Sequence, residues 1–134
     1  MNLHTVYMAI IPLTMLSIPL VAAPIDTLLN DYSEISTAPF SAERGQQLWM
    51  QEFPHTESNT VRSCAACHTN ELFREGKHIR TKKIIDPLAP SVNSTRLTDV
   101  KKVKKWLKRN CKWTLGRECT AQEKGDFITF IQAK

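Results

Sequence analysis

The most informative segment of the chain is Cys64-Ala65-Ala66-Cys67-His68. Two cysteines that are separated by two residues and followed by a histidine form the attachment pattern of c-type haem. The spacing lets both sulfurs reach vinyl groups on one haem, and it places the imidazole of His68 under the iron. We therefore expect one covalently bound haem c, held by Cys64 and Cys67, with His68 as an axial ligand of the iron.

A thioredoxin-like dithiol and half of a zinc site are the alternatives for this motif. A dithiol does not need His68, and no strand–helix–strand pattern surrounds the segment. A zinc site needs two further ligands at close spacing, but Cys111 and Cys119 have seven residues between them. Haem is the preferred interpretation, provided that the chain is exported.

The N-terminal segment indicates export. Residues 1–23 contain no Lys, Arg, Asp or Glu, and their apolar run is short for a membrane span and interrupted by Pro12 and Pro19. The run ends in small residues, which are typical of a secretory cleavage site. We expect a signal peptide over residues 1–23 and a periplasmic monohaem domain over residues 24–134. Because the start of the run lacks Lys and Arg, a retained membrane anchor is the alternative.

The charge of the chain bears on its partners. It has 18 basic and 13 acidic residues, a net charge of +5, and none of the charged side chains lies in residues 1–23. An exported protein rarely meets nucleic acid, so the basic excess does not indicate a nucleic-acid partner. It favours an acidic protein or an anionic membrane surface instead.

Apolar periodicity after the leader predicts an all-α fold, because no convincing alternating strand is present. Offsets of three and four predict a first helix over residues 25–35. Ser41 is a suitable N-cap for a second helix over residues 42–50. Gly45 in that helix is unfavourable by about 1 kcal/mol relative to alanine, so we expect it to allow close packing against another helix.

Two further helices are predicted in the C-terminal part. Thr98 and Asp99 open a lysine-rich helix that runs to Arg109, and the residues from Cys111 to Cys119 are expected to form a short loop. The buried stripe predicted for the lysine-rich helix is Val100, Val103, Trp106 and Leu107. The last helix should begin with a Thr120–Glu123 capping box, cross the 42–50 helix near Gly45, and bury Phe127, Ile128, Phe130 and Ile131.

The cysteines outside the haem motif are expected to pair. In an oxidising compartment Cys111 and Cys119 should form a disulfide that joins the lysine-rich helix to the last helix. Two free thiols are the alternative.

The second axial ligand is less obvious. Cytochromes that carry electrons usually have a methionine downstream of the motif, but the four methionines here are Met1, Met8, Met15 and Met50. Three belong to the predicted signal peptide, and core packing is expected for Met50. The absence of a later methionine argues against an ordinary electron carrier.

Five other side chains remain as candidates for this position: His55, His78, Lys82, Lys83 and Asn93. Solvent-facing positions are the main alternative for both histidines. Asn93 lies 25 residues after His68 in a constrained, partly apolar loop, which is long enough to reach the opposite face of a haem. An asparagine in a loop is also a common turn residue, so spacing alone leaves the choice open.

Longer segments of the chain resemble the sphaeroides haem protein (SHP) family, a group of oxygen-binding class I cytochromes c. The haem motif occurs in every class I cytochrome c, whereas the Pro-Ser-x-Asn loop at residues 90–93 together with the C-terminal cysteine pair is much more specific. The similar segments are 40–45, 64–68, 87–93, 98–99, 102–103, 105–106, 109–111, 115–120 and 123–126.

The resemblance implies a class I cytochrome c fold, with helices around one covalently attached haem. It also implies that Asn93 is the sixth ligand of the ferric iron and that Cys111 and Cys119 are bonded. Reduction would release Asn93 and let O2, NO or CO bind. This chain departs from the usual family sequence in the loop, where Ser94 and Leu97 stand in place of the proline and phenylalanine that the family often has.

Family resemblance further implies a dihaem cytochrome c or a membrane cytochrome b as the electron donor. A plain electron-transfer cytochrome and a haem-based oxygen or nitric oxide reductase are the alternative functions. Because no acid–base pair near the motif is recognisable, no catalytic residue is predicted.

Overall fold

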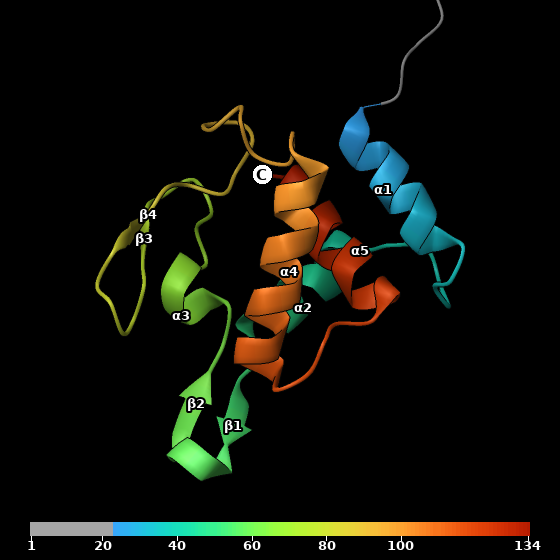
Figure 1. Cartoon of the computed structure of the whole chain (residues 1–134). Coiled ribbons are helices and arrows are strands. Elements are labelled where there is room, and N and C mark those ends of the chain that lie inside the picture. Colours follow the sequence, from blue (N-terminus) through green and yellow to red (C-terminus); the bar gives the residue numbers. More distant parts are fainter. Residues whose placement is uncertain (1–22) are drawn as a thin grey trace, which may run out of the picture.

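The computed structural model describes residues 23–134, so the predicted signal peptide lies, except for Ala23, outside the described residues. In chain order the elements are α1 (Pro24–Ser33), α2 (Ala42–Met50), β1 (Phe53–His55), the 3-10 turn η1 (Thr56–Ser58), β2 (Thr60–Arg62), α3 (Ala65–His68), β3 (Gly76–Lys77), β4 (Ile84–Ile85), α4 (Val100–Leu115) and α5 (Ala121–Gln132). In Figure 1, α3 and both pairs of strands lie on the opposite side of α4 from α1.

Helices dominate the fold, as predicted, but two short antiparallel hairpins accompany them. Strands β1 and β2 pair over three residues each, and β3 pairs with β4 over two. Strands this short are below the length at which alternation becomes recognisable in a sequence. Between residues 23 and 134, no helix combines the length and the apolar character needed to cross a bilayer.

The crossing of α2 and α5 is the main helix contact and confirms the prediction around Gly45. Ser41 caps α2 by accepting a hydrogen bond from the backbone N–H of Arg44 at 3.2 Å. A Cβ at Gly45 would overlap the carbonyl group of Asp126 on α5 and would lie 2.8 Å from the Cβ of Phe130. Only glycine therefore permits the two helix backbones to approach this closely.

A buried carboxylate ties the same two helices together. Asp126 is 4% exposed, and its oxygens accept hydrogen bonds from the Arg44 guanidinium at 2.9 and 3.0 Å and from the Ser41 backbone at 2.7 Å. A buried charge needs such partners, because an unpaired one is strongly destabilising. Sequence periodicity does not predict these bonds of Asp126, since its partners are more than 80 residues away along the chain.

Helix α1 lies against α5, where Ile25 and Leu28 are buried with Ile128. The helix ends at Ser33, and Ile35 is 76% exposed. The predicted extension of its apolar face to Ile35 is therefore wrong.

Helix α4 is longer than predicted, and one member of its expected buried stripe faces solvent. It continues through Cys111 to Leu115, so the predicted Cys111–Cys119 loop is only its final part. Trp106 is half exposed and stacks with the Arg109 guanidinium, 5.0 Å from the ring centroid. At about 100° per residue, Trp106 falls about 120° from Val100 and thus outside the stripe that packs inward.

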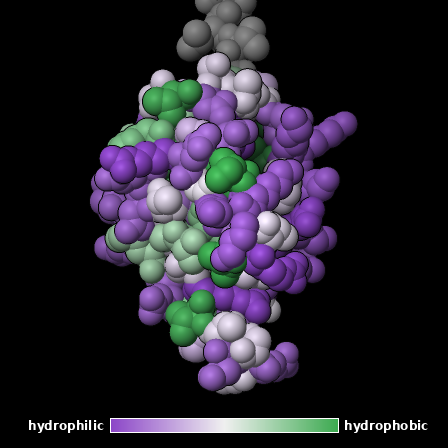
Figure 2. Space-filling view, turned by 90° about the vertical axis from the view of Figure 1, so that its left-hand side faces the viewer, coloured by the Kyte–Doolittle hydropathy of each residue, from purple (hydrophilic) through white to green (hydrophobic). Residues whose placement is uncertain are grey.

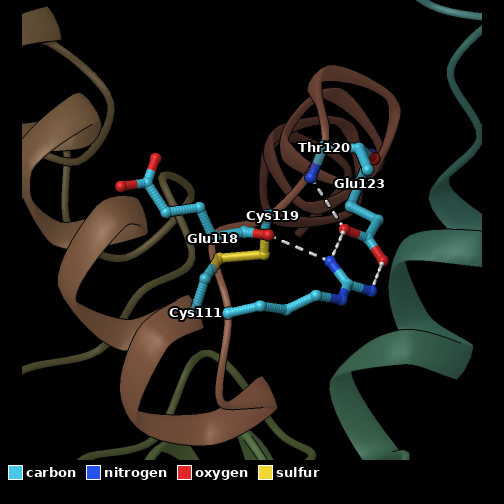
Figure 3. Close-up of a disulfide and its surroundings, with 6 residues drawn as sticks. Cys111, Glu118, Cys119, Thr120 and Glu123 are labelled. Carbon is cyan, nitrogen blue, oxygen red and sulfur yellow. Dashed lines mark hydrogen bonds and ion pairs between the residues drawn. A yellow bond between two sulfur atoms is a disulfide. The ribbon is translucent and has the colours of Figure 1, made fainter.

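The expected disulfide is present. Cys111 and Cys119 are bonded, with 5.6 Å between their Cα atoms, and both belong to the core that includes Phe127, Phe130 and Ile131. Arg117 is paired with Glu123, at 2.6 and 2.7 Å, and Figure 3 shows Glu118, Thr120 and Glu123 around the disulfide. Glu123 also accepts from the Thr120 backbone at 2.8 Å, which completes the predicted capping box at the start of α5.

Candidate haem-binding site

Helix α3 brings the three side chains of the haem motif together. It is a single turn that begins directly after Cys64, so Cys64, Cys67 and His68 stand at spacings of three and four and share one side of the turn. Cys64 and Cys67 are free thiols, and Cys67 is buried. Burial raises the pKa of the Cys64 thiol to about 12, outweighing the lowering effect of its contact with the Thr114 side chain. The two thiols lie on the same side of the turn, as thioether bonds to one haem require.

His68 has the character of a metal ligand. Burial lowers the pKa of its imidazole to about 4, and the positive charge of Arg96 lowers it further. The ring is therefore neutral at physiological pH and offers a lone pair. Its buried Nδ1 atom has no hydrogen-bond partner among the described residues.

The Trp49 side chain, from α2, lies against the imidazole of His68. Its indole N–H donates a hydrogen bond of 2.9 Å to the carbonyl oxygen of Thr69, and its ring centroid lies 5.5 Å from that of His68. The same indole packs against Phe127 and Phe130 of α5, at 6.1 and 5.7 Å between centroids. The motif is thereby fastened to the α2–α5 crossing.

The loop after the motif is held close to α3. A Cβ at Gly76 would overlap the carbonyl oxygen of Cys67 and would lie 3.0 Å from the Cα atom of His68. Further along, the backbone N–H groups of Leu88 and Ala89 both donate to the carbonyl oxygen of Leu72, at 2.8 and 2.9 Å. Glycine at position 76 therefore lets this loop approach α3 closely.

Asn93 lies in the loop where it was predicted, and its amide has local partners. Its Nδ2 donates to the carbonyl of Pro87 at 3.2 Å, and its Oδ1 accepts from the Thr95 hydroxyl at 2.8 Å and the Thr95 backbone at 3.3 Å. These bonds are local to the loop and do not test a bond to iron, so the role of Asn93 as a ligand stays a prediction. Arg96 in the same loop affects the pKa of His68, which places this loop near the site.

The two alternative histidines have other partners. His55 is half-buried in β1, and its Nε2 hydrogen-bonds the carbonyl of Thr114 at 2.8 Å. Nδ1 of His78 accepts hydrogen bonds from the backbones of Arg80 and Thr81, at 3.3 and 3.1 Å. The solvent-facing alternative is therefore wrong for His55, whereas His78 is only half-buried and its two bonds lie at the surface.

The remaining candidates lie at the surface. Lys82 and Lys83 are exposed between β3 and β4. Met50 is 43% exposed rather than in the core, because it follows the buried Trp49 directly and points to another side of α2.

Arg62 is a site neighbour that the sequence analysis missed. It donates to the Trp113 carbonyl at 2.8 Å and its guanidinium stacks over the Trp113 ring at 4.6 Å. Together with His55 it satisfies carbonyl groups in the last turn of α4, where cations and donors are favoured. These bonds attach the β1–β2 hairpin, which directly precedes the haem motif, to α4; no local sequence signal reveals them.

Comparison with known proteins decides the family. The family described as "Domain of unknown function (DUF1924)" matches residues 35–131. The cytochrome c-type protein SHP of Cereibacter sphaeroides is 40% identical over 107 residues, which are 80% of this chain and 81% of that protein. The chain belongs to the SHP family of class I cytochromes c.

Solved structures agree with this assignment. A structure of oxidised SHP, described as an oxygen-binding cytochrome c, matches with a TM-score of 0.72 at 38% identity, covering 84% of this chain and 98% of that one. Oxidised cytochrome c'' of Methylophilus methylotrophus matches with a TM-score of 0.73 at 33% identity, covering 82% and 94%. By sequence, cytochrome c'' is 43% identical over 76 residues, or 57% of this chain and 53% of that protein. A solution structure of the same cytochrome c'' concerns haem-ligand detachment.

The predicted class I cytochrome c fold is thus confirmed, and this SHP-family protein is a monohaem cytochrome with haem c as its cofactor. The chain's own residues fit that group. Beside the thiols and the neutral His68, the segment between His68 and Asn93 exposes large apolar side chains, namely Phe73, Ile79, Ile84 and Val92, by 39–58%. Figure 2 shows apolar side chains interspersed among hydrophilic ones on the side that carries α3 and the hairpins. An apolar macrocycle suits such surroundings.

Proposed function

We propose that this protein is an exported, periplasmic cytochrome that accepts electrons and binds a diatomic gas at its ferrous haem. Cys64 and Cys67 hold the haem through thioether bonds, His68 is the permanent axial ligand, and Asn93 is a weak ligand that can be displaced. The single observation that supports this most is the neutral, half-buried His68, with its buried Nδ1 atom, beside two free thiols on one helical turn.

Haem iron supplies the change of oxidation state and a position for O2, NO or CO. Asn93 contributes a neutral, hard and weak donor, which suits ferric iron and is held poorly by ferrous iron. Its release leaves an amide close to the open position, where it can donate a hydrogen bond to a bound gas. The description of the relative SHP as oxygen-binding supports this proposal.

The proposed electron donor is a dihaem cytochrome c or a membrane cytochrome b. Helix α4 offers the docking surface, which we call the lysine face: Lys101, Lys104, Lys105, Trp106 and Arg109, all exposed. Among the described ion pairs, none involves the four cations of this face. Because Thr114 in the last turn of α4 contacts the Cys64 thiol, the helix links this face to the haem attachment point.

Two measurements test the haem and the gas site. Acid–acetone extraction should leave the colour with the protein, since thioether bonds resist it. Carbon monoxide added to the reduced protein should shift the Soret band, whereas a closed electron carrier would barely respond. Turnover of O2 or NO with a reductant would indicate a reductase instead.

The variant Asn93→Ala tests the ligand itself. Its ferric iron should take water or another weak ligand and change spin state, while the reduced variant still binds carbon monoxide. Asn110→Ala, at an exposed position of α4, is the control and should keep the wild-type spectrum. An unchanged ferric spectrum in Asn93→Ala would refute Asn93 as the ligand.

A further inference from the structure

The residue directly after His68 has an unusual backbone conformation. Thr69 has φ 63° and ψ 177°, a region that is essentially restricted to glycine. A threonine stays there only when its surroundings hold it, and such residues concentrate at functional sites. The strain lies at the C-terminal end of α3, one peptide bond from the proposed iron ligand.

Four hydrogen bonds hold Thr69 in this conformation. Its backbone N–H donates to the carbonyl of Ala65 at 2.9 Å. Its hydroxyl donates to the Glu71 carbonyl at 3.0 Å and accepts from the Glu71 backbone at 3.2 Å. These three bonds are local to the segment, and only the fourth, from the Trp49 indole to the Thr69 carbonyl at 2.9 Å, comes from another helix.

Trp49 is well placed to act as a fixed point. It is 5% exposed and belongs to the core cluster that contains Phe127 and Phe130. Because α2 and α5 are locked by Gly45 and the Arg44–Asp126 pair, the indole cannot follow a movement of α3.

We propose that Trp49 is a positioning residue for the proximal ligand: its indole N–H holds the strained Thr69 carbonyl and thereby fixes His68 against the core. This inference rests on the proposed function. If Asn93 were released, His68 would be the one iron ligand that the chain still supplies. A rigidly held His68 would keep its imidazole available to the iron when a gas binds.

The variant Trp49→Phe tests the proposal, because it removes the N–H and keeps an aromatic ring in the core. Trp106→Phe on the exposed part of α4 is the matched control. Nitric oxide is the probe, since it weakens the bond to the ligand opposite. In Trp49→Phe the ratio of five- to six-coordinate nitric oxide complex, measured by electron paramagnetic resonance, should rise about fivefold, equivalent to about 1 kcal/mol for one hydrogen bond.

The iron–histidine stretching band of the reduced protein gives a second readout. We expect it to shift or broaden in Trp49→Phe and to stay unchanged in Trp106→Phe. If Trp49→Phe lowers only the unfolding midpoint and leaves both spectroscopic readouts at the wild-type value, Trp49 is merely structural and the proposal is wrong. A wild-type protein without an iron–histidine band would instead overturn the proposed role of His68, and this inference with it.

Backbone strain provides an independent test. Glycine adopts the conformation of Thr69 without strain, so in a Thr69→Gly background the Trp49→Phe change should raise the coordination ratio less than twofold. Lys82→Gly is the control, because Lys82 also has a positive φ, of 59°, but lies in an exposed turn. If Trp49→Phe alone does not fold, the double variant with Thr69→Gly should restore folding. Equal effects of Trp49→Phe in all backgrounds, or no restoration, would overturn the proposal.

Discussion

At the scale of single residues, the proposed gas site depends on how strongly one amide can bind iron. The Oδ1 atom of Asn93 is the donor that a metal would use, yet it already accepts two hydrogen bonds from Thr95. A hydrogen bond to the same oxygen competes for its lone pairs. Thr95 thus helps to keep Asn93 a weak ligand.

The variant Thr95→Ala should make Asn93 a stronger ligand. Loss of the hydroxyl removes a hydrogen bond worth about 1 kcal/mol, so the affinity of the oxidised protein for added imidazole, which must displace Asn93, should fall about fivefold. Imidazole titration of the oxidised protein followed at the Soret band measures this. Ser94→Ala, one residue away and exposed, is the control; an affinity that rises in Thr95→Ala contradicts the argument.

His68 should make stability depend on pH in a defined direction. Its pKa is lowered in the folded state, from 6.5 to about 4, so the unfolded chain binds the proton more tightly. An iron bound to the imidazole would lower this pKa further in the same direction, so the stabilisation is complete above pH 6.5 and is lost progressively as the pH falls below it. Urea unfolding of the haem-loaded protein at pH 7, 5.5 and 4 checks this. His78→Gln should show a similar decline, whereas a stability that stays flat would contradict it.

At the scale of elements, the α2–α5 crossing carries the site. Trp49 on α2 holds the end of α3, and α5 supplies the aromatic rings behind Trp49. Anything that separates α2 from α5 should therefore disturb the haem environment as well as the stability.

Gly45→Ala tests this dependence. Alanine favours a helix by about 1 kcal/mol over glycine, but its Cβ would overlap the Asp126 backbone, and overpacking of this kind costs about 1–3 kcal/mol. We expect a net loss of stability in urea unfolding, accompanied by a shifted iron–histidine band. Gln46→Ala, at the next and exposed position, should be neutral in both; an equally stable Gly45→Ala would show that the crossing is looser than described.

At the scale of the whole molecule, charge is distributed unevenly. The chain has a net charge of +5, and the lysine face gathers four exposed cations around the half-exposed Trp106. Tryptophan and arginine are enriched among residues that dominate binding energy. This surface therefore suits an acidic redox protein.

The rate of reduction by such a partner should fall steeply with salt. Charges on exposed surfaces are screened beyond about 8 Å at physiological ionic strength, and steered association loses its advantage accordingly. Stopped-flow reduction between low and high salt measures this slope. Lys104→Glu with Lys105→Glu should flatten it, and Lys77→Glu, on the β3–β4 hairpin, is the control. A rate that is independent of salt would mean that the lysine face is only a solvated surface.

Local chemistry explains what the sequence alone determined. The haem c cofactor, the capping residues Ser41 and Thr120, and the apolar stripe of α5 follow from a few neighbouring residues, so they were predicted correctly, whereas the individual haem ligands stay predictions. The disulfide followed from the number of cysteines left over. Even Gly45 was recognisable, because a glycine inside a helix needs a reason.

Contacts between distant segments decided the rest. Three interactions join residues 20 to 82 positions apart, and no periodicity in the sequence predicts such pairs. They are the Trp49–Thr69 hydrogen bond, the Arg44–Asp126 ion pair and the capping of α4 by Arg62. The wrong prediction that Trp106 is buried has the same cause. Trp106 lies at the edge of the apolar stripe of α4, where only the neighbouring helices decide whether a side chain is covered. The two short hairpins were not predicted, because strands of two or three residues are too short to show an alternating apolar pattern. Local sequence thus determines which residues of this cytochrome can bind haem. The fold determines how those residues are held in place, because packing and hydrogen bonds act through space rather than along the chain.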